Sequence, residues 1–94
     1  MPAKIEVERT GELEYRVRIF EKGSESAHHV SMKQDDYIRL TDGKIEPEEL
    51  LKLSFEFLLE RESKESILPR FDLSVISRYF PEYEREIKRR STSF

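Results

Sequence analysis

The sequence predicts an α+β fold, and two patterns carry that prediction. In the first third of the chain apolar and charged residues alternate, which is the period of a strand that buries one face. From Pro47 onward apolar residues recur at helical spacing instead. Because the strands come first and the helices follow, the class is α+β, not a βαβ alternation. We expect a three-stranded antiparallel meander over about residues 3–33, a long helix over about 47–62, and one or two short C-terminal helices.

The three strands are separated by two turn signals. Ile5 and Val7 alternate with glutamates, and Thr10–Glu12 then forms the first turn. The second strand has the cleanest alternation, and Lys22–Glu25 forms the turn after it. The residues expected on its apolar face are Leu13, Tyr15, Val17 and Ile19, and those of the third strand are His28, Val30 and Met32. Such alternation is typical of an antiparallel sheet covered on one side only.

The helical segments begin and end at residues suited to those positions. Asp35–Leu40 is expected to form one or two helical turns ended by Gly43, which adopts a left-handed conformation without steric cost. Pro47 opens the long helix, because its fixed φ and missing N–H suit the first helical position. Glu48 and Glu49 then lie at the positive end of the helix dipole.

The C-terminal region contains a second proline that divides it. Asp72 is the expected N-cap of a helix beginning at Leu73. Pro81 cannot continue that helix, so we expect two segments with Pro81 opening the second. The domain is taken to span residues 1–90, with Ser91–Phe94 as a frayed tail.

The long helix has an apolar surface wider than one sheet can cover. Its apolar residues extend over roughly 240° of the helix circumference, where packing on a sheet needs little more than about 100°. We expect the sheet to cover Leu50, Leu53 and Phe57. The remaining side would then dock a second copy or another protein, through Leu51, Phe55, Leu58 and Leu59. The Val75–Tyr79–Tyr83–Ile87 stripe is the one candidate within the chain for closing that side instead.

Composition excludes several classes of protein. The chain has 94 residues, enough for one domain, and no Cys, which rules out a disulfide framework and a cysteine nucleophile. No apolar run exceeds Phe57–Leu59, so a membrane-spanning helix is not expected. The N-terminus has no apolar signal-peptide core, and we expect a cytoplasmic protein. Asn is absent and Glu is abundant, as in hyperthermophile proteins, although chance in a short chain gives the same composition.

No motif indicates catalysis or a cofactor. His28 and His29 are the two histidines, and adjacent strand residues point to opposite faces, so they cannot chelate one metal ion. Gly11, Gly23 and Gly43 are isolated, which excludes a phosphate-binding or dinucleotide-binding loop. We therefore expect no catalytic residue, no metal and no cofactor, and rank an enzyme with carboxylate chemistry third among the function classes.

The function favoured by these patterns is a small non-enzymatic protein-interaction module that self-associates as a homodimer or docks a protein partner. The alternative is a nucleic-acid-binding regulator, similar to an antitoxin, with a basic C-terminal surface of Arg78, Arg85, Lys88, Arg89 and Arg90. The formal net charge of −3 argues against a dedicated polyanion binder. Cations in a last helical turn also stabilise the negative end of the helix dipole without binding anything.

One block of the sequence resembles a known family. Between Ser54 and Ile87, the segments 54–62, 66–68 and 70–84 resemble a family of short uncharacterised prokaryotic proteins, and the resemblance brings no established activity, cofactor or partner with it. The order of strands followed by a helix is also similar to that of HicB-type antitoxins. The glycine-rich segment and the threonine that precede the helix there are not matched here, so this second resemblance is one of fold order.

Overall fold

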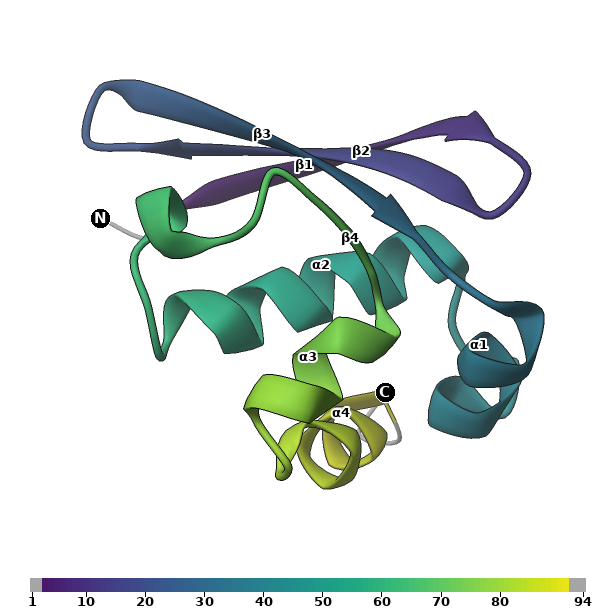
Figure 1. Ribbon diagram of the computed structural model, residues 1–94. Helices are drawn as coiled ribbons and strands as arrows, with labels where there is room; N and C mark the ends of the chain where they lie inside the picture. Colours follow the sequence, from purple (N-terminus) through teal and green to yellow (C-terminus); the bar gives the residue numbers. More distant parts are fainter. Residues whose placement is uncertain (1–2, 92–94) are drawn as a thin grey trace.

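The sheet forms one side of the molecule and the helices form the other (Figure 1). The structure is a computed structural model that describes residues 3–91. The strands are β1 (Lys4–Gly11), β2 (Glu14–Glu21), β3 (Ser24–Ser31) and β4 (Arg70–Asp72), in that order across the sheet. β1–β3 form the expected antiparallel meander, whereas β4 pairs parallel to β3. The α+β class is confirmed, and the sheet is mixed because of a strand that was not predicted.

The meander has one apolar and one charged face. Tyr15, Val17 and Ile19 are buried beneath the sheet. On the open face Arg18 and Arg16 of β2 form ion pairs with Glu6 and Glu8 of β1, at 3.0 and 3.3 Å. The expectation for Leu13 is wrong: it lies in the β1–β2 turn with φ 56°, so β2 begins one residue later.

The helices are α1 (Gln34–Thr41), α2 (Pro47–Leu59), α3 (Ser74–Tyr79) and α4 (Tyr83–Ser91), with a 3₁₀ turn η1 (Lys64–Ser66). α1 ends at Asp42 and Gly43, which both have positive φ. α2 begins at Pro47 as predicted but ends at Leu59, three residues before the expected end. There the backbone amide of Arg61 donates to the carbonyl of Leu58 in a tighter turn.

The C-terminal region is divided at Pro81 as predicted, but α4 begins two residues later, at Tyr83. α3 begins at Ser74 with Leu73 as its N-cap, one residue later than expected. The Asp72 carboxylate still binds the start of this helix: its Oδ2 accepts hydrogen bonds from the Ser74 amide (3.0 Å) and hydroxyl (2.6 Å). Burial raises the pKa of the Asp72 carboxyl, and hydrogen bonds from Ser74 and Ser31 outweigh it, so the pKa lies below its ordinary value. Ser91 was expected in the frayed tail, yet it is buried in the last turn of α4. Residues 92–94 of that tail lie outside the described residues.

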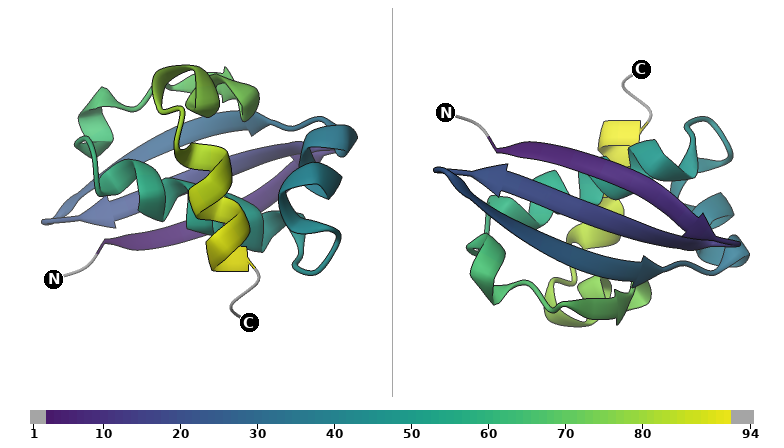
Figure 2. Two further views of the ribbon diagram at one scale, coloured as in Figure 1. Left: turned by 90° about the horizontal axis from the view of Figure 1, so that it is seen from below. Right: turned by 90° about the horizontal axis from the view of Figure 1, so that it is seen from above.

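α2 lies between the sheet and the C-terminal helices, which explains its wide apolar surface. Figure 2 shows α4 crossing the side of α2 that faces away from the sheet. The ring of Phe55 contacts His28 of β3 and Phe71 of β4, at centroid distances of 5.6 and 6.0 Å. The ring of Phe57 contacts Tyr83 of α4 at 5.3 Å. The two phenylalanines therefore have the opposite assignment to the one expected: Phe55 faces the sheet and Phe57 faces α4.

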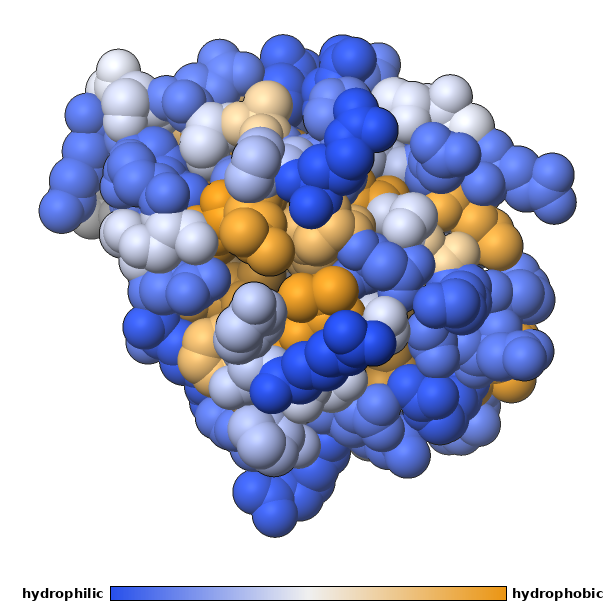
Figure 3. All heavy atoms as spheres, viewed as in Figure 1, coloured by the Kyte–Doolittle hydropathy of each residue, from blue (hydrophilic) through white to orange (hydrophobic). Residues whose placement is uncertain are grey.

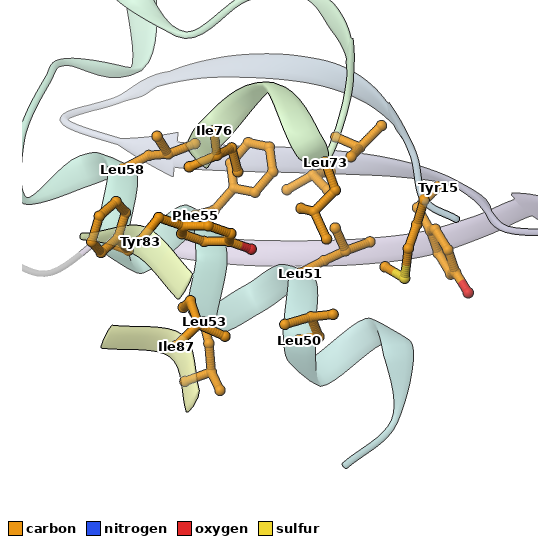
Figure 4. Packing of buried hydrophobic residues seen from close by; sticks show 14 of the residues in the cluster. Tyr15, Leu50, Leu51, Leu53, Phe55, Leu58, Leu73, Ile76, Tyr83 and Ile87 are labelled. Atoms are coloured by element: carbon orange, nitrogen blue, oxygen red, sulfur yellow. The ribbon is translucent and has the colours of Figure 1, made fainter. Parts of the chain in front are cut away.

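The helix face predicted to bind a partner belongs to the core. Leu51 and Phe55 have no exposed surface, Leu58 is 3% exposed, and Leu59 is partly buried against the same cluster. Figure 4 shows Leu51, Phe55 and Leu58 packed among side chains of the sheet, α3 and α4. The expectation that this face is exposed is wrong, because β3, β4 and α3 of the same chain cover it.

Candidate functional site

A groove beside α3 is an apolar depression of the surface. It lies between the C-terminal end of α2, the connection from η1 to β4, and α3, with a volume of about 440 Å³. Figure 3 shows apolar side chains gathered on this face, bordered by hydrophilic ones. We call it the apolar groove, and its apolar lining consists of Leu58, Ile67, Leu68, Phe71, Val75, Ile76, Tyr79 and Phe80.

Two large apolar side chains of the groove are exposed. Tyr79 is 69% exposed and Leu68 is 46% exposed, while Ile67 and Ile76 beneath them are buried. Soluble proteins expose single apolar residues routinely, but two such side chains bordering an apolar depression mark an interaction site more often than chance surface. Glu62 also lines the groove, and no cation within residues 3–91 lies at ion-pair distance from it.

A buried histidine fixes the groove wall that carries Leu68. The His28 Nδ1 lies 2.8 Å from the carbonyl oxygen of Leu68. A carbonyl only accepts, so Nδ1 carries the proton, and Nε2 accepts from the Ser26 hydroxyl at 2.9 Å. His28 therefore ties β3 to the segment before β4, which forms this wall. His28 was expected to face inward and His29 outward. His28 is buried and His29 is exposed, which confirms both expectations.

We expect the stability of the protein to fall below about pH 6.5 through His28. Burial of the His28 ring lowers its pKa, against the opposing hydrogen bond to Leu68. The unfolded chain therefore takes up a proton below the ordinary pKa of 6.5 while the folded protein does not, so stability is complete above that value and declines as the pH falls. Urea unfolding at about pH 7.5 and about pH 5.5 should show a smaller acid loss for His28→Gln than for the natural sequence. His29→Gln is the control and should keep the natural slope; equal slopes for all three proteins would contradict the prediction.

The five basic residues assigned to nucleic-acid binding lie on two helices. Arg78 lies on α3, and Arg85, Lys88, Arg89 and Arg90 lie on α4. Arg90 makes ion pairs with Glu60 at 2.8 Å and Glu86 at 3.3 Å, and Arg89 pairs with Glu86. Arg90 also lies 6.0 Å from the ring centroid of Phe57. The Arg90 contacts with Glu60 and Phe57 link α4 to α2, whereas the Arg89–Glu86 pair lies within α4.

Within residues 3–91 no three His, Asp or Glu side chains are close enough to hold a metal ion. No helix in that part of the chain combines the length and the apolar character needed to cross a membrane. Comparisons with protein-family models, curated proteins and solved structures found no match.

The sequence did not predict the groove, because its lining comes from three separate segments: the end of α2, the connection before β4, and α3. Periodicity within one segment does not show that these three lie together. In the sequence, Leu68 stands out only as part of the block that resembles a family, and Tyr79 belongs to the apolar stripe expected to pack on the long helix. Tyr83 and Ile87 of that stripe are buried, but Tyr79 points to solvent. The usable signal was Ile67–Leu68 before Pro69: two apolar residues in an irregular segment, where a strand or helix does not account for them.

Proposed function

We propose that the protein is an interaction module that binds a short apolar segment of a partner protein in the apolar groove. The observation that carries this is the exposure of Tyr79 and Leu68 at an apolar depression of about 440 Å³. Aromatic and aliphatic anchors of this kind dominate the centres of protein interfaces. A groove of about 440 Å³ has the size of a pocket that encloses a few anchor side chains, which suits a short apolar segment.

The charge of the groove further defines the segment. Glu62 is the one charged residue among those that line the groove, the remaining polar one being Ser66, and no ion pair joins Glu62 to a cation among residues 3–91. A Lys or Arg next to the apolar anchors of the bound segment would neutralise it. The proposed occupant is therefore an apolar peptide with an adjacent basic residue.

We expect Leu68→Asp to weaken the binding of such peptides at least about tenfold. The probe is a randomised peptide library displayed on phage; selected peptides should share large apolar residues with a neighbouring Lys or Arg. Their affinities are then measured by fluorescence anisotropy with the natural protein and its variants. Ile38→Asp is the matched control, because Ile38 on α1 is also 46% exposed but lies outside the groove, and it should bind normally.

Glu62→Gln should weaken the selected peptides but not versions in which their basic residue is replaced by Ala. Failure to select any peptide, or binding that Leu68→Asp leaves unchanged, contradicts the proposal. Loss of self-association in Leu68→Asp would make a second copy the occupant and would also overturn it.

A further inference from the structure

The outer edge of β1 is a long strand edge without a partner. β1 lies at one end of the four-stranded sheet, and no strand within residues 3–91 pairs with its outer side. The opposite edge is formed by β4, which has three residues, whereas β1 has eight. A long unpaired edge presents backbone groups that another strand can bind.

The hydrogen bonds of the sheet show which residues of β1 present those groups. In β3, the His29 amide donates to the Pro69 carbonyl, and the Ser31 carbonyl accepts from the Leu73 amide. Odd-numbered residues of β3 thus point their backbone groups toward β4, and even-numbered ones toward β2. Even-numbered residues of β3 pair with odd-numbered residues of β2, so the even-numbered residues of β2 direct their backbone groups to β1 and pair there with even-numbered residues. The odd-numbered residues of β1, which include Ile5 and Val7, therefore direct their N–H and C=O groups to the open edge.

We propose that two copies of this chain associate through β1, antiparallel and centred on Ile5, to form one continuous sheet. In this arrangement Ile5 pairs with Ile5 of the second copy, and Ala3 pairs with Val7. These residues share the inward face of the sheet, where Ala3, Ile5 and Val7 are only partly buried within one copy. The second copy covers their remaining apolar surface and satisfies the backbone groups of the edge.

Three antiparallel registers, centred on Ile5, Glu6 or Val7, place the apolar faces of both copies on the same side of the joined sheet. The charges opposite each other across the strands favour the register centred on Ile5. Centred on Ile5, Lys4 of each copy lies opposite Glu6 of the other, which gives two cross-strand pairs of opposite charge. Centred on Glu6, each Lys4 lies opposite Glu8 of the second copy, but the two Glu6 side chains lie directly opposite each other at the centre. Centred on Val7, each Glu6 lies opposite Glu8 of the second copy. The two other registers therefore place like charges together, which destabilises a pairing.

The helical layer leaves room for the same register. Figure 2, in the view from above, shows α2 and α4 reaching past β1 beside the C-terminal half of the strand. The N-terminal half, which contains Ile5, is clear of them. A pairing centred on Ile5 therefore lies farther along the strand from these helices than one centred on Val7. The apolar groove lies near β4, which forms the opposite edge of the sheet from β1. The proposed β1 interface is therefore separate from the proposed peptide site.

Sedimentation equilibrium of four proteins tests the proposal. The natural chain should sediment at twice its 11.3 kDa mass, and Glu6→Lys should weaken the dimer at least about tenfold, because it places Lys4 opposite a second cation. The double variant Lys4→Glu/Glu6→Lys restores opposite charges and should restore the dimer. Glu8→Lys is the matched control: it also loses an ion pair with a β2 arginine, yet should dimerise normally.

Amide hydrogen exchange provides a second measurement. The Ile5 and Val7 amides should become protected as the protein concentration rises, and Glu6→Lys should remove that dependence. A natural chain that remains monomeric at tens of micromolar overturns the proposal. Equal weakening by Glu6→Lys and Glu8→Lys, or no rescue by the double variant, overturns the register. Leu68→Asp should leave the dimer intact, which keeps this result separate from the test of the groove.

Discussion

Phe55→Ala is expected to lower the free energy of unfolding by about 3–5 kcal/mol. Phe55 has no exposed surface and lies where α2 meets both β3 and β4, with its ring against His28 and Phe71. Truncation removes the buried ring and leaves a cavity that the surrounding strands cannot close, since they are held by sheet hydrogen bonds. Domains of this size have a total stability of about 5–15 kcal/mol, so the loss is a large part of it.

Urea unfolding followed by circular dichroism measures this loss, and Leu59→Ala is the comparison within the same helix. Leu59 is only partly buried, so its truncation should lower stability by less than the roughly 1.5–3 kcal/mol of a fully buried side chain. If the two variants lose equal stability, or if Phe55→Ala changes the association state of a fully stable monomer, Phe55 is not the core residue described here.

Ser54→Ala is expected to lower the free energy of unfolding by about 1–3 kcal/mol, and Tyr83→Phe by less, about 0.5–1.5 kcal/mol. The two hydroxyl oxygens lie 2.6 Å apart in the core, and the Ser54 hydroxyl is 2.8 Å from the Leu50 carbonyl oxygen. Because the serine donates to that carbonyl, Tyr83 must donate to Ser54. Removing Ser54 leaves a buried tyrosine hydroxyl without an acceptor, whereas removing the Tyr83 hydroxyl leaves the Ser54 donor satisfied.

The double variant Ser54→Ala/Tyr83→Phe should be more stable than Ser54→Ala alone, because it removes the unsatisfied hydroxyl. Unfolding curves of the four proteins give the coupling free energy directly. Burial raises the pKa of the Tyr83 hydroxyl far above its ordinary value, so the tyrosine stays neutral throughout these measurements. Additive losses would contradict the pairing of the two hydroxyls.

The two proposed interfaces lie at opposite edges of the sheet, which has a consequence for assembly. A dimer formed through β1 carries one apolar groove at each outer end, so it presents two peptide sites facing away from each other. A bivalent partner then binds more tightly to the dimer than to the Glu6→Lys variant, although each groove is unchanged. The two proposals remain separable, because their variants lie in different elements.

The sequence predicted strands and helix ends correctly where residues close together in the chain determine them. The meander follows from strict alternation along β1–β3, since a strand with one buried face needs little more than its own pattern. The start of α2 at Pro47 and the break between α3 and α4 at Pro81 follow from the fixed φ and missing N–H of proline. The hydrogen bond from the Ser74 amide to Asp72 follows from the carboxylate of a single residue placed just before a helix.

The tertiary structure alone decided which surface covers which. The sequence showed that α2 has more apolar surface than one sheet can cover, but not that β4, α3 and α4 complete the enclosure from within the same chain. β4 has three residues, too few for a periodic pattern, and it forms only because the chain returns to pair with β3. The same return leaves Leu68 and Tyr79 exposed at the apolar groove and places β1 at an open edge. Periodicity determines which face of an element is apolar. The partner of that face depends on contacts between residues far apart in the sequence, such as Ser31 and Asp72, which are 41 positions apart.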